Sequence, residues 1–390
     1  MKQNLLFYSI LLLCLCGCVE NQSQQVSTPP NIILIFADDL GYGDLSCYGS
    51  PVNKTPRLDQ LATEGIKLTS FYVAAPVCTP SRASLLTGRY SIRHLPGNLG
   101  PESQHGLPLS EVTIASLLKE KGYATAAFGK WHLGHATPDI MPTGRGFDRY
   151  YGLMYSNDMI KPWVQTEFPL MMYENEEKIR EVGYEQQELT NEYTKKTLDF
   201  IEENKDQPFF VYLPYSMPHL PIAAPDNYLK KANNNLYRAV IENIDTGVGA
   251  ILDKLESLQL SENTLVIFTS DNGPWHNLPD RMLQKGNERW HSGSTGVLRG
   301  AKATTYEGGF RVPAILRWPK EFPENVVYSN MLSTMDLFPT IASIAGVDLP
   351  KNLMLDGMNA RDFLNGTNSQ SPRDTLFYFR VKKLEAVRVN

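Results

Sequence analysis

The sequence predicts an α/β fold with a large, mostly parallel central sheet and helices on both of its faces. Continuous apolar runs at residues 31–37, 208–214 and 265–270 carry this prediction. A strand of a parallel sheet is covered on both faces, so it reads as an unbroken apolar run. Amphipathic stretches separate these runs, as in chains whose helices cross between parallel strands. With 390 residues and 42% hydrophobic content, the chain can form one large domain and a smaller one.

The N-terminus is predicted to direct export. Lys2 precedes an apolar run over residues 5–15, which is too short to span a bilayer as a helix. The order Leu-Cys-Gly-Cys at 15–18 resembles a bacterial lipobox, which makes residues 1–17 a lipoprotein signal peptide and Cys18 the lipidated first residue. A plain cleaved signal peptide is the alternative. The polar residues 18–30 would form a tether, and the protein is expected in the bacterial periplasm or lipid-anchored to the outer membrane.

Charge and cysteine content argue against a nucleic-acid-binding protein and against a disulfide-stabilised one. The net charge of −5 is spread along the chain without a basic stripe, so no nucleic-acid partner is expected. If Cys18 carries lipid and Cys78 is modified as described below, Cys47 has no partner, and no disulfide framework is expected.

The remaining elements follow in order along the chain. Residues 123–128 and 314–319 read as further strands, while 160–190 reads as a charged, irregular surface excursion and 274–294 as a polar loop. Residues 155–190 and 274–294 are expected to shape substrate specificity. Helical periodicity predicts helices over 55–62, 113–121, 188–204 and 237–259, and one that begins at 335.

Polar residues follow four of the predicted strands at the point where each ends. They are Asp38 and Asp39, Lys130 and His132, His219, and Asp271 and Asn272. Ligand sites of α/β sheets lie beyond the carboxyl ends of the strands, so these side chains are expected to converge. Carboxylate and amide oxygens suit a hard cation such as Ca²⁺ or Mg²⁺, and the lack of a Cys/His cluster argues against zinc. The structural alternatives are an Asx turn at the aspartates, a surface Lys-x-His pair and a satisfied core histidine.

The segment Cys-Thr-Pro-Ser-Arg at 78–82 places a cysteine at a turn into a helix. The free N–H groups and the dipole of a helix start favour an anion. Arg82 lies one helical turn after Cys78 and therefore on the same face, where its guanidinium can grip a tetrahedral anion. A buried structural cysteine before an ordinary helix is the alternative.

These segments resemble the motifs of the type I sulfatases. The family signature, C-x-P-S-R followed by L-T-G, matches residues 78–88. Gly-Lys-Trp-His-Leu-Gly at 129–134, Ser-Met-Pro-His at 216–219 and the segment 299–313, which contains Lys302, resemble three further motifs. The match at 155–158 is weaker and suggests Ser156 as a substrate contact. Within the family the chain looks most like arylsulfatases and N-acetylgalactosamine-6-sulfatases, and the resemblance implies an alkaline-phosphatase-like fold.

The resemblance also implies a mechanism for hydrolysis of a sulfated carbohydrate or aryl sulfate. A formylglycine-generating or anaerobic sulfatase-maturing enzyme would oxidise Cys78 to formylglycine, whose hydrate attacks sulfur. One Ca²⁺, or Mg²⁺, would be held by Asp38, Asp39, Asp271, Asn272 and the modified Cys78. Arg82, Lys130 and Lys302 would clamp the anion, with His219, Lys302 and Ser156 also contacting substrate. His219 with Lys302 would protonate the leaving alcohol, and His132 would take a proton to release sulfate.

Domain limits and two rival functions complete the predictions. Residues 31–345 are expected to form the catalytic domain, and 346–390 to begin a small C-terminal subdomain that is largely absent from this chain. One rival is a phosphomonoester or phosphonate hydrolase of the same superfamily, which typically uses two zinc ions and several histidine ligands. The other is a catalytically dead, glycan-binding lipoprotein, which would require a missing catalytic residue although every family position is filled.

Overall fold

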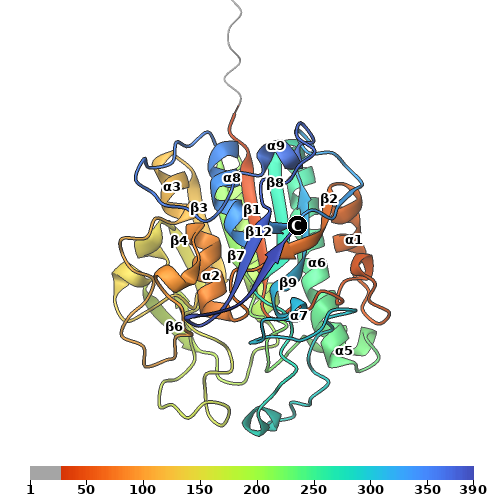
Figure 1. Ribbon diagram of the computed structural model, residues 1–390. Coiled ribbons are helices and arrows are strands. Elements are labelled where there is room, and N and C mark those ends of the chain that lie inside the picture. The colour runs from red at the N-terminus through yellow and green to blue at the C-terminus, as the bar shows by residue number, and fades with distance from the viewer. Residues whose placement is uncertain (1–27) are drawn as a thin grey trace, which may run out of the picture.

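The computed structural model of the protein describes residues 28–390 (Figure 1). The predicted signal peptide (1–17), Cys18 and all of the predicted tether except residues 28–30 lie outside the described residues. Among the helices of residues 28–390, none combines the length and the apolar character that crossing a membrane requires.

An eleven-stranded sheet runs through the centre of the described chain in the order β10-β2-β9-β8-β1-β7-β3-β4-β5-β6, with β11 also paired to β2. Within this sheet, β9 and β5 run against the direction of the other strands, which confirms the prediction of a mostly parallel α/β sheet. Its strands are β1 (Asn31–Ala37), β2 (Ile66–Tyr72), β3 (Ala124–Lys130), β4 (Arg149–Leu153), β5 (Met171–Glu174), β6 (Glu177–Glu181), β7 (Phe209–Pro214), β8 (Thr264–Ser270), β9 (Arg311–Arg317), β10 (Val326–Tyr328) and β11 (Leu332–Ser333).

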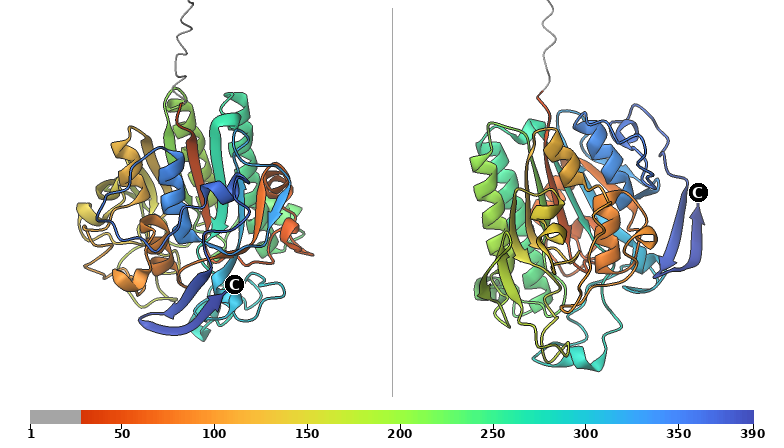
Figure 2. Two further views of the ribbon diagram at one scale, coloured as in Figure 1. Left: turned by 45° about the horizontal axis from the view of Figure 1, so that its top comes forward. Right: turned by 90° about the vertical axis from the view of Figure 1, so that its left-hand side faces the viewer.

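Helices cover both faces of the sheet, as the right-hand view of Figure 2 shows. One face carries α1, α4 and α6, and the opposite face carries α2, α3 and α8. The helices are α1 (Pro56–Thr63), α2 (Cys78–Thr87), α3 (Ile114–Glu120), α4 (Leu189–Glu203), α5 (Asp226–Lys231), α6 (Leu236–Ser257), α7 (Glu307–Phe310), α8 (Leu337–Ile344) and α9 (Arg361–Leu364). Because both faces are covered, all seven residues of β1 are buried, as its unbroken apolar run predicts.

Strand register decides where the polar residues after each strand emerge. In the parallel pair β1–β8, Ala37 lies opposite Ser270, and in the pair β1–β7, Phe36 lies opposite Pro214. The segments that follow these three strands therefore leave the sheet side by side at one edge. Strand β3 pairs with β7 on the far side from β1, so Lys130 at its end reaches the same edge.

The prediction that 160–190 is irregular is wrong for residues 171–181. Residues 171–181 form an antiparallel hairpin, β5–β6, that extends the central sheet beyond β4. Asn175 makes the turn with a φ of 54°, a left-handed conformation that asparagine tolerates. The hairpin is short and charged, as sheet edges commonly are, so it lacks the apolar run that identifies a buried strand.

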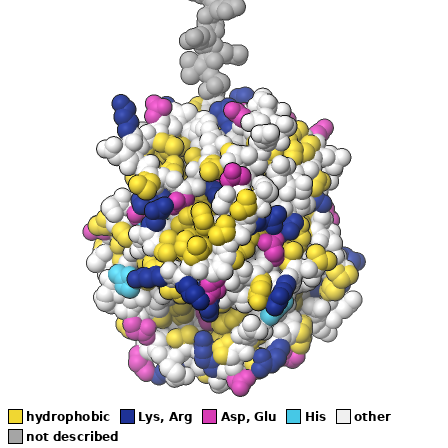
Figure 3. Space-filling model, in the orientation of Figure 1, with side chains coloured by type: hydrophobic (Ala, Val, Ile, Leu, Met, Phe, Trp, Pro, Cys, Tyr) yellow, Lys and Arg dark blue, Asp and Glu magenta, His cyan; other side chains and the backbone are white. Residues whose placement is uncertain are grey.

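The C-terminal stretch adds a separate two-stranded antiparallel sheet made of β12 (Thr375–Arg380) and β13 (Lys383–Val389). Figure 3 shows apolar side chains gathered near the centre of the face that this hairpin crosses. Exposed apolar residues of the hairpin include Phe377, Leu384 and Val387. That 346–390 begins a larger subdomain stays a prediction.

Candidate active site

Helix α2 begins at Cys78, directly after Val77 in an extended conformation. The Cys78 side chain is buried; its Sγ lies 3.6 Å from Asp38 Oδ1 and 3.3 Å from Lys302 Nζ. Burial raises the pKa of the Cys78 thiol far above its ordinary value, although Lys130 and Lys302 act in the opposite direction. An unmodified thiol here is therefore neutral at physiological pH and a weak nucleophile.

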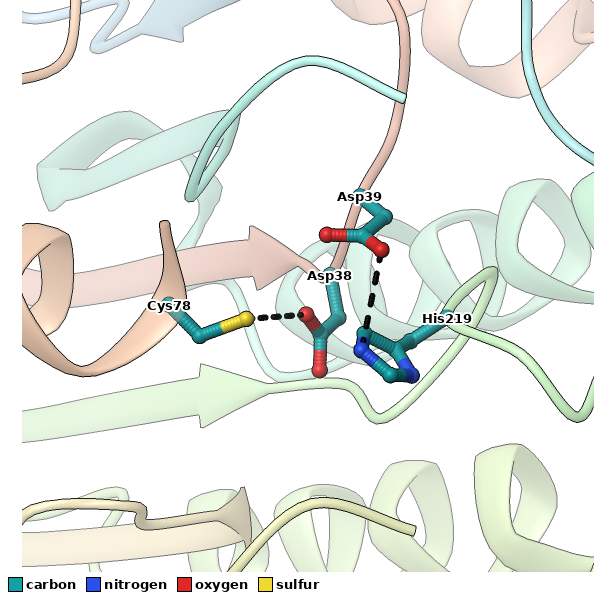
Figure 4. Close-up of side chains that lie close together, drawn as sticks. All are labelled: Asp38, Asp39, Cys78 and His219. Carbon is teal, nitrogen blue, oxygen red and sulfur yellow. Dashed lines mark hydrogen bonds and ion pairs between the residues drawn. The ribbon is translucent and has the colours of Figure 1, made fainter. Parts of the chain in front are cut away.

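Asp38 and Asp39 follow β1 and turn their carboxylates toward Cys78 and His219 (Figure 4). Asp39 has a φ of 63°, and this left-handed conformation breaks the alternation of side chains along the strand. Asp38 accepts a hydrogen bond from Lys130 Nζ, and Asp39 accepts from Lys302 Nζ at 2.7 and 2.8 Å. Burial alone would raise the pKa of Asp38, but Lys130 and its other cationic neighbours hold that pKa well below the ordinary value.

Asp271 and Asn272 follow β8 and lie against the same pair of aspartates. Asp271 Oδ1 accepts the backbone N–H of Asp39 at 3.0 Å, and Asn272 Nδ2 donates to Asp39 Oδ1 at 2.6 Å. Burial and the neighbouring Asp38 charge raise the pKa of Asp271 to about 7. Asn272 Oδ1 is buried and has no hydrogen-bond partner, which is an unusual state for a buried amide oxygen.

The three predicted cationic residues occupy two kinds of position: the lysines lie among the acidic side chains, and the arginine lies beneath them. Lys130 at the end of β3 bridges Asp38 and Ser156, with 3.0 Å from its Nζ to Ser156 Oγ, while Lys302 lies between Asp39 and Cys78. Arg82 is fully buried and directs Nε and Nη2 to Asp271 Oδ2 at 3.1 and 2.9 Å, and Nη1 to the Lys130 carbonyl. Its guanidinium therefore orients the carboxylates from behind.

His132 is held in one tautomer by the backbone. Its Nε2 lies 2.9 Å from the Leu99 carbonyl oxygen, which can only accept, so Nε2 carries the proton and Nδ1 the lone pair. Nδ1 is buried and has no hydrogen-bond partner. Burial and, to a lesser degree, the Lys130 charge hold the pKa of His132 well below its ordinary value. The ring is therefore a neutral base with a free lone pair.

A backbone carbonyl also fixes the tautomer of His219, but here the protonated nitrogen is Nδ1. Its Nδ1 lies 2.6 Å from the Leu220 carbonyl oxygen, so Nε2 carries the lone pair and lies 3.6 Å from Asp39 Oδ2 and 3.5 Å from Ser156 Oγ. Burial, followed by Lys302, lowers the pKa of His219 well below its ordinary value. The predicted contact residue Ser156 thus lies between Lys130 and His219.

Trp275 belongs to the site although the motifs gave it no role there. The ring is half-buried, its centroid lies 5.7 Å from that of His219, and Lys302 Nζ lies 4.9 Å from it. A lysine over an indole face is a cation–π contact that restrains the ammonium group. The available signal was its position three residues after Asn272, in the segment that leaves the end of β8.

The donor set fits a hard divalent cation. Single ligand atoms of Asp38, Asp39, Cys78 and His219 lie within 4.8 Å of one another. The predicted ligands Asp271 and Asn272 border this group, and the unpartnered Asn272 Oδ1 supplies a free oxygen. Burial is also the main reason that the pKa of Asp39 is raised, so its negative charge is costly without a cation. Oxygen atoms dominate the set, as Ca²⁺ and Mg²⁺ prefer.

A mostly parallel sheet with this carboxylate-rich cluster at the carboxyl ends of its central strands is the arrangement of the alkaline-phosphatase-like fold. The crystal structure of phosphonate monoester hydrolase from Agrobacterium radiobacter has the same fold, with a TM-score of 0.63 over 90% of this chain and 80% of that one at 20% identity.

Comparison with known proteins then identifies the family. The Sulfatase family model matches residues 30–347, so the chain belongs to the sulfatase family. Arylsulfatase A of Homo sapiens is 39% identical over 379 residues, which cover 91% of this chain and 71% of that protein. N-acetylgalactosamine-6-sulfatase of Canis lupus familiaris is 38% identical over 388 residues, 92% of this chain and 70% of that protein. The crystal structure of Ps i-CgsB superimposes with a TM-score of 0.81 at 33% identity, covering 93% of this chain and 83% of that chain. The protein is accordingly a sulfuric ester hydrolase.

Proposed function

We propose that the protein removes sulfate from a sulfated carbohydrate, with a formylglycine made from Cys78 as the nucleophile. One observation carries this proposal: a buried thiol with a strongly raised pKa lies 3.6 Å from Asp38 and 3.3 Å from Lys302. A thiol that stays protonated is a poor nucleophile even beside these charged groups. A hydrated aldehyde at the same carbon would offer two hydroxyl groups within this charged cluster.

In the proposed reaction, one hydroxyl of the hydrated side chain attacks sulfur and the bond from sulfur to the alcohol oxygen breaks. Lys130 and Lys302 would bind the sulfuryl oxygens, while Arg82 keeps Asp271 in place from behind. His219 and Lys302 would deliver the proton to the departing alcohol. Although burial opposes it, Asp39 raises the pKa of Lys302, which therefore keeps its proton. His219 is neutral here, so its Nε2 would first take up the proton that the attacking hydroxyl releases and would then pass a proton to the alcohol.

His132 would act in the second half of the reaction. Its free Nδ1 would accept the proton of the remaining hydroxyl, so that the bond to the bound sulfate breaks and the aldehyde forms again. A serine at position 78 has no second hydroxyl on its carbon and could not complete this step. The hydrogen bond from Thr79 Oγ1 to the His132 carbonyl, 2.9 Å, ties His132 to the turn that carries residue 78.

A calcium ion, with Mg²⁺ as the alternative, is proposed to be held by Asp38, Asp39, Asp271 and Asn272 together with the modified residue 78. When bound, such an ion would polarise a sulfuryl oxygen and orient the reacting groups. The oxygen-rich donor set and the unpartnered Asn272 Oδ1 support this choice over zinc.

The substrate class rests on similar proteins and on two side chains beside the catalytic groups, Ser156 and Trp275. Relatives include an N-acetylgalactosamine-6-sulfatase, and Ps i-CgsB has been crystallised with k-i-k-neocarrahexaose. Ser156 and Trp275 lie against the catalytic groups in positions suited to contact a sugar. We further propose maturation by a formylglycine-generating or anaerobic sulfatase-maturing enzyme, export, and a lipid anchor at Cys18 in the bacterial periplasm or outer membrane.

Paired assays test the proposed function. Full-length protein co-produced with a maturing enzyme is expected to hydrolyse 4-nitrophenyl sulfate and N-acetylgalactosamine 6-sulfate, and to hydrolyse 4-nitrophenyl phosphate far more slowly. Faster turnover of the phosphate ester would replace the proposal with the phosphoesterase alternative. Lack of turnover by protein shown to carry formylglycine would support a dead, glycan-binding protein.

A further inference from the structure

A cavity lies between the two loop regions that were expected to shape specificity, residues 155–190 and 274–294. It measures about 320 Å³, and its lining includes Trp163, Tyr184 and Gln186 from one region, and Lys285 and Asn287 from the other. Pro221 forms a further part of the wall. The indole N–H of Trp163 donates to the Gln284 carbonyl at 3.2 Å, which joins the two regions across the cavity.

The cavity is tied directly to the catalytic residues. Pro221 is two residues beyond His219, so their Cα atoms are separated by at most about 7.6 Å. Asn157, which follows Ser156, donates from Nδ2 to the carbonyl oxygens of His219 and Pro221 at 3.3 and 3.1 Å, and to Gln186 Oε1 at 2.9 Å. Asn157 therefore ties the backbone that carries His219 to the Pro221 and Gln186 walls of the cavity.

The walls combine aromatic rings with unused polar groups. The rings of Trp163 and Tyr184 meet edge to face with centroids 5.6 Å apart, and the Tyr184 side chain is 53% exposed. Lys285 places Nζ 5.1 Å from the centre of the Tyr184 ring and, among residues 28–390, has no carboxylate within 4.0 Å. Asn287 is only 6% exposed, yet its Nδ2 has no hydrogen-bond partner. A buried amide donor of this kind requires an acceptor.

We propose that this cavity binds the sugar residue next to the sulfated one, and that the bound residue carries a sulfate or carboxylate group. The inference rests on the proposed function and narrows the substrate to an anionic oligosaccharide. The exposed part of the Tyr184 ring offers apolar surface that the C–H groups of a pyranose ring can contact. Asn287 Nδ2 and Lys285 Nζ supply the two donors that a neighbouring hydroxyl and anion accept. An apolar aglycone would leave both donors without a partner.

Binding measurements on the full chain carrying Cys78→Ala test this inference, because the variant cannot consume its ligand. The probes are N-acetylgalactosamine 6-sulfate alone and the same sugar linked to a neutral hexose, a sulfated hexose or a uronic acid. At low salt, either anionic disaccharide is expected to bind about tenfold or more tightly than the single sugar, a gain of about 1.4 kcal/mol. The sulfated and uronic arms show which anion the cavity accepts.

Two exposed substitutions locate the effect. Adding Lys285→Ala should remove most of the gain for the anionic disaccharides, and adding Tyr184→Ala should weaken all disaccharides relative to the single sugar. Lys351→Ala, a change of an exposed lysine outside the cavity, is the matched control and should keep the full gain. Disaccharides that bind no more tightly than the single sugar, or a gain that survives Lys285→Ala, would overturn the proposal.

This binding test and the test of the proposed function can fail separately. Binding does not require formylglycine or turnover, so a protein without sulfatase activity would still bind the anionic disaccharides more tightly than the single sugar. Conversely, an active sulfatase without the gain would overturn only the second binding site.

Discussion

Two clusters of buried charge in this protein are built in opposite ways. Near the C-terminus, Asp336 and Arg373 form a closed pair. Asp336 Oδ1 accepts from Arg373 Nη2 and the Met358 N–H, and Oδ2 accepts from Arg373 Nε and the Ser333 N–H. The active-site cluster instead holds three aspartates: burial and then the Asp38 charge raise the pKa values of Asp39 and Asp271. It also leaves Asn272 Oδ1 and His132 Nδ1 unpartnered.

The difference separates structural charge from functional charge. A buried pair with every acceptor used holds two segments together, and here it joins the start of α8 to the chain before β12. A buried cluster with unused acceptors costs stability that a ligand or cation can recover. The free atoms in the active site are those that the proposed reaction assigns to a cation and to a proton.

The largest effect should come from changing the residue at the centre of the active-site cluster. Cys78→Ser is expected to lower kcat by at least about a thousandfold, since removing a nucleophile abolishes most of an enzyme's rate enhancement. Its melting temperature should stay close to that of the wild type. Cys47→Ser, which changes the half-buried cysteine outside the site, is the control and should retain activity. Near-normal turnover by Cys78→Ser would contradict the proposed mechanism.

Cation removal should affect the active-site cluster and leave the Asp336–Arg373 pair unchanged. Chelation with EGTA is expected to abolish aryl sulfate hydrolysis and lower the melting temperature, and added Ca²⁺ should restore both. Saturation at a hundredfold excess over Kd would stabilise the fold by about 2.7 kcal/mol. Asp271→Asn should reduce the calcium-dependent shift in melting temperature. Full activity in metal-depleted protein, checked by elemental analysis, would refute the cation site.

The closed pair should show the reverse behaviour. Asp336→Asn leaves Arg373 buried without its charged partner, so the free energy of unfolding is expected to fall by about 3–5 kcal/mol. The kcat/KM of the folded protein should change little. Asp271→Asn should lose activity while costing less stability, because buried Arg82 keeps Asp38 as a second carboxylate partner at 3.4 Å and one of three crowded carboxylates is removed. Chemical denaturation and kinetics on both variants would show whether the two clusters differ in this way.

The smallest predicted effect concerns pH. The pKa of His132 is lowered, so the neutral base should persist as pH falls through 6.5, the ordinary value for histidine. The acid limb that His132 contributes to kcat is therefore expected below pH 6.5. A pH profile of kcat on 4-nitrophenyl sulfate would measure this acid limb. A limb at or above pH 6.5 that disappears in His132→Gln would show that the pKa of His132 is not lowered.

The sequence predicted the fold and the meeting of strand ends because both depend on local patterns. An unbroken apolar run followed by Asp38, or by Asp271, reveals a buried strand and the edge at which it ends. Contacts that depend on side-chain direction across the fold were not predictable in this way. Arg82 was expected to grip the anion, yet its donors face Asp271 and the Lys130 carbonyl. Trp275 and the charged β5–β6 hairpin carry no periodic signal and acquire their positions from tertiary packing.

Mass spectrometry of the peptide containing residue 78, combined with kinetics on the same preparations, tests the central claim most directly. Preparations with different degrees of maturation should show kcat rising in proportion to the fraction in which the CH₂SH side chain has become an aldehyde or its hydrate. Full activity in protein whose Cys78 remains an unmodified thiol would contradict the account.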